Sequence, residues 1–276
     1  MVTPTWSWLL TRWSLEPSVV AGIVMLTLAY ACACGYRLTG PASLRCSAAQ
    51  RTWFLLSDLV LVIALLSPLD GIGDTYLFSA HMVQHLLLAT VWPPLLLLSL
   101  PADLTAGIQG MPVRVLGLLT LPAVAFLLFN GDITVWHLPV LYDLTLRSET
   151  VHILEHLTFM GTGLVVWWPV LNPVRRGRLS YAGQELYLFA NLFPTMALGI
   201  LFSFLQHPLY GPYIHAPRLW GISALTDQQI GGLIMWMPGN LPYVVAMATI
   251  GVIWLDRGEP VDEPRREMEV RPRTVP

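Results

Sequence analysis

The chain has 276 residues, of which 55% are hydrophobic and only 12% are charged, and its mean hydropathy is +0.60. Soluble domains carry about 25% charged residues, so this composition excludes an ordinary soluble enzyme and indicates an integral membrane protein. The net charge of -2 offers no basic surface for nucleic acid. Membrane lipid is therefore the first expected partner, and no nucleic acid is expected.

Apolar runs of about 20 residues, long enough to cross a bilayer as helices, recur along the chain. They predict an all-α membrane protein, a bundle of about seven transmembrane helices within a domain at 18–256. Residues 1–17 contain Trp6, Trp8 and Trp13, which predict an interfacial segment, and the charged, proline-rich stretch 257–276 predicts a disordered cytoplasmic tail. The predicted spans are 18–36, 51–69, 77–100, 114–136, 150–171, 183–206 and 229–255.

The distribution of arginine predicts the orientation of the bundle. With the N-terminus outside and the C-terminus in the cytoplasm, the inner segments hold twelve of the fifteen basic residues, and the outer segments keep only Arg12, Arg147 and Arg218. Cytoplasmic loops carry such an excess. A signal peptide cleaved near Ala31 is the alternative, but it would carry the arginines at 37, 45 and 51 across the membrane.

The three cysteines do not indicate a disulfide framework. Cys32 and Cys34 lie two residues apart in the first span, so they project about 200° from each other on a regular helix and do not chelate one ion. Small apolar filler is the preferred interpretation. Cys46 falls in a loop that the orientation assigns to the reducing cytoplasm.

All seven histidines fall toward the outer side once the spans are oriented. Four form two pairs, His81/His85 in HMVQH and His152/His156 in HILEH, in the outer part of the third and fifth spans. Positions i and i+4 lie about 40° apart on a helix and one turn along its axis, so each pair projects two imidazoles toward one point. Imidazole is a common ligand of transition metals and is costly to bury in lipid. The pattern therefore predicts a metal site at the outer face.

The residues around the pairs qualify this prediction. Imidazole suits zinc, copper, iron or nickel, and nearby thioethers favour Cu(I); Met82, Met235 and Met237 tilt the choice toward copper. Other outer-side residues were assigned auxiliary roles: Gln84 and Glu155 orient imidazoles as hydrogen-bond acceptors, Asp227 caps the seventh helix or binds the ion as a hard ligand, and His207 ends the sixth span near the site.

Alternatives remain open from the residues alone. HILEH matches the HxxEH zinc-peptidase pattern, in which the glutamate is a general base, although HMVQH has the same arrangement without a base. A haem-binding electron-transfer protein could use one histidine of each pair as an axial ligand. A copper transporter should have polar groups continuing to the inner face, where the chain offers little beyond Asp58, Glu185 and Asn191.

Four segments in order, HMVQHLLL, FNGDITVWHLPVLYD, HILEHLTFMGTGLVVWWPV and DQQIGGLIMWMPG, resemble the CtaG family of multi-span membrane assembly factors for caa(3)-type cytochrome c oxidase. The resemblance extends from the second span to the seventh. It implies a multi-pass protein of the bacterial plasma membrane that is not an enzyme and that acts on cytochrome c oxidase subunits.

The resemblance also implies a metal and a ligand set. Members of the family occur joined to copper-transport-like membrane domains, which favours copper over zinc or haem. The expected function is a chaperone that binds copper and passes it to the oxidase. The implied metal ligands are His81, His85, His152 and His156, with His137 of the VWH segment as a contributor.

Overall fold

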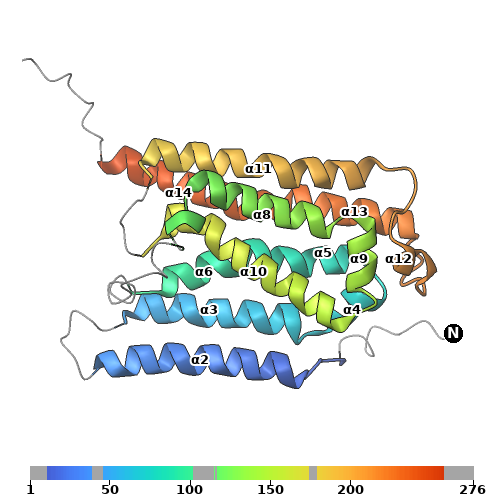
Figure 1. The fold of residues 1–276 in the computed structure, drawn as a ribbon, viewed down its shortest axis with the longest axis horizontal. Helices are drawn as coiled ribbons and strands as arrows, with labels where there is room; N and C mark the ends of the chain where they lie inside the picture. The colour runs from blue at the N-terminus through green and yellow to red at the C-terminus, as the bar shows by residue number, and fades with distance from the viewer. Residues whose placement is uncertain (1–10, 39–45, 102–114, 116, 174–178, 258–276) are drawn as a thin grey trace, which may run out of the picture.

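The computed structural model describes residues 11–38, 46–101, 115, 117–173 and 179–257, and all regular elements in these ranges are helical. The long helices run side by side along one axis (Figure 1). The all-helical prediction is confirmed. The elements are α2 (Pro17–Leu38), α3 (Ala48–Leu65), α4 (Pro68–Thr75), α5 (Phe78–Leu86), η2 (Leu87–Val91), α6 (Trp92–Ser99), α8 (Pro122–Trp136), α9 (Pro139–Thr145), α10 (Glu149–Leu171), α11 (Tyr181–Phe204), α12 (Gly211–His215), α13 (Ala224–Trp236), η3 (Pro238–Asn240) and α14 (Leu241–Arg257).

Five helical segments of the described chain are long and apolar enough to cross a membrane, and the α8–α9 pair, bent by 77°, makes six if it is one span. α10 has 23 residues, but it carries two histidines and two glutamates among its first eight residues and is not among these segments. A seventh span at α10 therefore stays a prediction. The five segments are Pro17–Cys34, Ala48–Leu65, Phe78–Ser99, Tyr181–Phe204 and Ala224–Arg257.

Most of the arginines that carry the orientation prediction, and most of both predicted end segments, lie outside the described residues. These include residues 1–10 of the interfacial segment and the tail from 258 onward. The orientation also depends on arginines whose side chains are not described: Arg37, Arg45, Arg114, Arg175, Arg176, Arg178, Arg265, Arg266, Arg271 and Arg273.

The third predicted span is one continuous rod with a π-helical turn in its middle. The turn, η2, begins two residues after His85, and at its end the Trp92 N–H donates to the carbonyl of Leu87, five residues back. Pro93 and Pro94 follow, and proline has no N–H with which to continue the α-helical pattern. Single π-turns of this kind often occur at functional sites.

The short helices gather at one end of the bundle. α4, α9 and α12 lie together there, where α5 and α10 begin (Figure 1). Next to these short helices, an aromatic cluster packs around Phe78, Tyr142, Tyr210 and Tyr213. A larger core around Phe129, Phe159 and Trp167 fills the middle of the bundle. One end is therefore rich in short helices and polar groups, and the middle is apolar.

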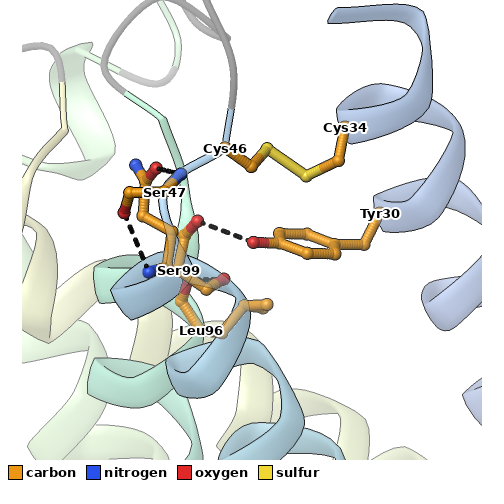
Figure 2. Close-up of a disulfide and its surroundings, with 7 residues drawn as sticks. Tyr30, Cys34, Cys46, Ser47, Leu96 and Ser99 are labelled. Atoms are coloured by element: carbon orange, nitrogen blue, oxygen red, sulfur yellow. Dashed lines mark hydrogen bonds between the residues drawn. A yellow bond between two sulfur atoms is a disulfide. The ribbon is translucent and has the colours of Figure 1, made fainter. Parts of the chain in front are cut away.

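A disulfide joins Cys34 of α2 to Cys46 just before α3 (Figure 2). The expectation from the sequence was wrong here, because the spacing argument considered only cysteines on one helix, whereas this bridge links two antiparallel helices. Cys32 is free and exposed. The bridge lies at the end of the bundle opposite α4, α9 and α12 (Figure 1).

α2 lies at the edge of the bundle and is held by few contacts besides this bridge. The Tyr30 ring stacks on Phe54 with centroids 3.8 Å apart, and its hydroxyl donates to the carbonyl of Ser99 (Figure 2). The Thr27 hydroxyl donates to the Asp58 carboxylate over 2.6 Å. Asp58 therefore links α3 to α2.

Candidate metal centre

The two histidine pairs lie on α5 and α10, near the N-terminal ends of these helices. Within each pair the helical spacing brings the rings into contact, with centroids 4.2 Å apart for His81 and His85 and 4.1 Å apart for His152 and His156. The pairs also face each other across the two helices. The His81 and His152 rings are 5.2 Å apart, and the His85 and His156 rings are 5.5 Å apart.

Five side chains from these two helices bring one ligand atom each to within 4.8 Å of all the others. Below, they are called the five-donor cluster. All are buried except His152, which is only slightly exposed. Nitrogen and carboxylate ligands of one first-row metal lie about 2.0–2.2 Å from it, so the spacing suits a single shared ion. The members are His81, His85, His152, Glu155 and His156.

Most of the converging atoms have no hydrogen-bond partner. Both ring nitrogens of His85, both carboxylate oxygens of Glu155, and the Nε2 atoms of His81, His152 and His156 are buried without one. Thr145 is a neighbour of Glu155, but the Thr145 hydroxyl donates its proton to the carbonyl of Tyr142 and not to the carboxylate. Buried polar atoms without partners are rare in folded proteins. A bound cation would give these lone pairs a partner, so the residues fit a metal.

The surrounding hydrogen bonds set the tautomer of His81. The Tyr213 hydroxyl donates its only proton to the carbonyl of Gly73 over 2.7 Å and lies 3.0 Å from His81 Nδ1. The hydroxyl therefore accepts from Nδ1–H, which leaves His81 Nε2 as a lone pair. A partner of this kind holds a ligating imidazole in position. Tyr213 takes the orienting role that the sequence analysis gave to Gln84.

Asp74 of α4 lies at the more open edge of the cluster. Its carboxylate oxygens are 3.8 Å from His81 Nδ1 and 3.5 Å from His152 Nδ1, and a third of its side chain is exposed. Burial disfavours the carboxylate and the nearby charge of Asp70 adds to this, so the pKa of Asp74 is raised to about 8. A cation at the neighbouring histidines would favour the charged form, so its binding would release a proton.

His137 is not part of the five-donor cluster but lies beside it. It caps α8 at the 77° bend before α9, where Pro139 makes helix unfavourable for the preceding residue. Its ring is 5.9 Å from that of His85. Its Nδ1 lies 2.7 Å from the carbonyl of Ile133, and its Nε2 lies 3.4 Å from the sulfur of Met82.

Most of the predicted auxiliary residues do not contact the imidazoles of the cluster. Gln84 donates to the carbonyl of Ala64 and to Asp70, away from the imidazoles, and Asp227 accepts from the N–H groups of Phe78 and Ser79, so it caps α5 and not its own helix. Ser223 caps that helix. Met235 is buried near Met82, whereas Met237 and His207 are exposed.

Two residues of the site were missed by sequence reasoning. Asp74 had a signal, because Asp70 and Asp74 are spaced i, i+4 in the polar connection directly before the third span. Tyr213 had none, since the short helix α12 that carries it approaches α5 only in the folded chain. Both contact His81, so the polar surroundings of this imidazole come from segments distant in sequence.

The sequence model of one protein family matches residues 20–257, which include every residue of the five-donor cluster. The family is described as cytochrome c oxidase caa3 assembly factor. The chain belongs to this family. The match confirms the resemblance noted in the sequence and shows a membrane protein of an oxidase assembly family.

Curated relatives of this assembly-factor chain come from mycobacteria. The uncharacterized proteins Mb0105 of Mycobacterium bovis and MT0111 of Mycobacterium tuberculosis are each 26% identical to it over 91% of its length. The uncharacterized protein ML1998 of Mycobacterium leprae is 25% identical over 88%. The chain spans about 40% of the length of these relatives. No solved structure matches it.

Proposed function

We propose that this assembly factor binds copper as cargo in the five-donor cluster and passes it to a subunit of cytochrome c oxidase. The observation that carries the proposal is the convergence of buried donor atoms without partners from α5 and α10. The family supplies the oxidase as the recipient. The protein acts in the bacterial plasma membrane as a chaperone for the ion and performs no catalysis.

The composition of the cluster supports a transition metal over calcium or magnesium. Four of the five donors are imidazoles, whereas calcium and magnesium take oxygen ligands. Imidazoles are neutral and reversible ligands, and Glu155 contributes the one negative charge that partly offsets a buried cation.

Release of the ion requires an accessible ligand. His152 is the most exposed member of the cluster, and the still more exposed Asp74 lies against it. We propose that a recipient subunit approaches this end of the bundle and that its own ligands replace His152 and Asp74 first. The buried imidazoles would then dissociate from the ion one after another. This sequence of exchange keeps the ion coordinated throughout.

The first test measures metal loading of the oxidase in cells. In a strain that lacks this protein, we expect purified oxidase to contain normal haem but several-fold less copper. The wild-type protein and a His215→Ala variant, changed at an exposed histidine, should restore the copper. Glu155→Gln should not, because it removes the charge at the centre. A normal copper-to-haem ratio without the protein would contradict the proposed function.

The distribution of arginine leads us to propose that the metal centre faces the outside. The Cys34–Cys46 end then faces the cytoplasm, which keeps thiols reduced, so this orientation requires that the pair joined as a disulfide in the structure be open dithiols in growing cells. In a Cys32→Ser background, a membrane-permeant maleimide should label the pair in intact cells without prior reduction, and an impermeant maleimide should not.

The opposite outcome is equally clear. If cells quenched with acid contain the disulfide, and if an impermeant reagent labels the pair from outside only after reduction, the Cys34–Cys46 end lies outside. The metal centre would then face the cytoplasm. A cysteine introduced at the exposed His215 reports from the other end of the bundle and should show the inverse labelling in each case.

A further inference from the structure

Met82 and His137 face each other in a way that ordinary hydrogen bonding does not explain. The carbonyl of Ile133 can only accept, so His137 Nδ1 carries the proton. In the neutral ring Nε2 then presents a lone pair, and this atom lies 3.4 Å from the Met82 sulfur, which is itself an acceptor. Both side chains are buried. Two acceptors thus meet without a proton between them, as they would around a shared cation.

A small cavity lies beside this pair. It has a volume of about 30 Å³, and its lining includes Met82, His85, His137 and Met235. This volume is about that of one water molecule in the liquid, which suits a single ion or water. Two methionines and two histidines therefore line one small, partly open cavity.

A glycine allows the second methionine to reach this space. Gly231 lies one turn before Met235 on α13, and a Cβ added there would lie 2.4 Å from the Phe78 ring and 3.2 Å from Met82 Cγ. Only a residue without a side chain permits this close approach of α13 to α5. The approach sets the turn that carries Met235 against Met82, and both belong to the same buried cluster.

We propose that Met82, His137 and Met235 form a second metal site, selective for Cu(I), next to the five-donor cluster; this inference rests on the proposed copper-handling function. Thioether sulfur is a soft ligand that selects Cu(I), whereas the carboxylate and imidazoles of the cluster also suit harder ions. Donor–metal distances of about 2.0–2.3 Å leave two ligands of one ion roughly 3–4 Å apart, as His137 Nε2 and Met82 Sδ are.

His85 connects the two sites. It belongs to the five-donor cluster and also lines the cavity, and neither of its ring nitrogens has a hydrogen-bond partner. The donors therefore become softer from Asp74 at the open edge, through the buried cluster, to the buried Met82 and Met235. A Cu(I) ion that enters at Asp74 would be held most selectively at the inner end.

The experiment uses the purified full chain in detergent, loaded anaerobically with Cu(I) from a chelator that sets its free concentration. X-ray absorption at the copper edge detects sulfur ligands directly. We expect a sulfur shell in the wild type, which the Met82→Leu/Met235→Leu variant loses, together with at least about a tenfold weaker affinity for Cu(I). Leucine conserves volume in a core. Met160→Leu is the matched control, because Met160 packs elsewhere, against the core between α3 and α6.

A fourth sample separates this inference from the proposed function. His81→Ala with His152→Ala should lose the ion of the five-donor cluster and keep the sulfur shell. A wild type without copper–sulfur scattering, or a sulfur shell that survives the paired methionine variant, overturns the soft site and leaves the cluster standing. If the histidine variant keeps the sulfur shell and binds as many copper ions as the wild type, the Met82/His137/Met235 site stands and the five-donor cluster is overturned as a copper site. If the paired variant does not fold, the single Met235→Leu should weaken the sulfur scattering.

Discussion

Replacing His81 and His152 by alanine should abolish high-affinity metal binding at the five-donor cluster while the bundle stays folded. The change removes one imidazole from each helix of the five-donor cluster. Four-ligand structural zinc sites bind with about 10–16 kcal/mol, or about 3 kcal/mol per ligand. Two lost ligands should therefore weaken binding by roughly 10⁴-fold. A competition titration against a chelator of known affinity measures this.

Folding of the variant is checked separately. The two large cores around Trp167 and Tyr210 lie outside the histidine pairs, so thermal unfolding without metal should remain cooperative. Metal at a hundred times its Kd stabilises a protein by about 2.7 kcal/mol per site; the wild type should show the corresponding rise in Tm, and the variant should lose the part of it that comes from the five-donor cluster. His81→Gln with His152→Gln, which keeps more volume, covers the case in which alanine unfolds the chain.

A matched pair of exposed residues controls for the loss of histidine as such. His207→Ala with His215→Ala removes two imidazoles that lie at the surface, and its metal affinity should equal that of the wild type. Equal weakening in both double variants would show that binding is nonspecific and would contradict the site.

Gly163→Ala should destabilise the protein by about 1–3 kcal/mol, the usual cost of overpacking a core. A Cβ at this position would lie 2.6 Å from the carbonyl oxygen of Ala89 and 2.7 Å from Pro93. Neither the backbone nor a proline ring can move aside cheaply, so α10 must shift away from η2. Chemical unfolding of the metal-free protein in detergent measures the loss.

The same change should also weaken metal binding, because it acts on the spacing between the two histidine pairs. Gly163 lies two turns after His156 on the same helix face, and Ala89 lies one turn after His85. Gly161→Ala on the same helix is the matched control, since a Cβ there meets nothing within 4 Å; it should leave affinity unchanged and should not lower stability, because alanine favours helix over glycine. Identical behaviour of the two variants would contradict the close packing as the cause.

The histidine pairs could be predicted because their signal is local. Spacing i, i+4 fixes the relative position of two side chains on any helix, so His152 and His156 meet whatever surrounds them. The helices themselves were evident from apolar length. Gln84 and Glu155 show the limit of this reasoning. They hold the same place in their motifs, yet Glu155 faces the cluster, whereas Gln84 faces Asp70 and Ala64.

What could not be predicted depends on contacts between distant segments. Tyr213 reaches His81 from the short helix α12, 132 residues away, and Asp227 caps a helix that begins 149 residues earlier in the chain. The Cys34–Cys46 bridge requires the antiparallel packing of two helices, which no spacing within one helix reveals. His137 was placed near the site by family resemblance, but its sulfur neighbour became evident only in the fold.

Elemental analysis of the detergent-purified protein, recorded with its visible absorbance spectrum beside the His81→Ala/His152→Ala variant, tests the central claim most directly. The account predicts copper in the wild type, less copper in the variant, and no Soret band in either. Copper retained in full by the folded variant would contradict the five-donor cluster as the binding site. A Soret band that disappears with the two histidines would show that they hold haem and not a copper ion.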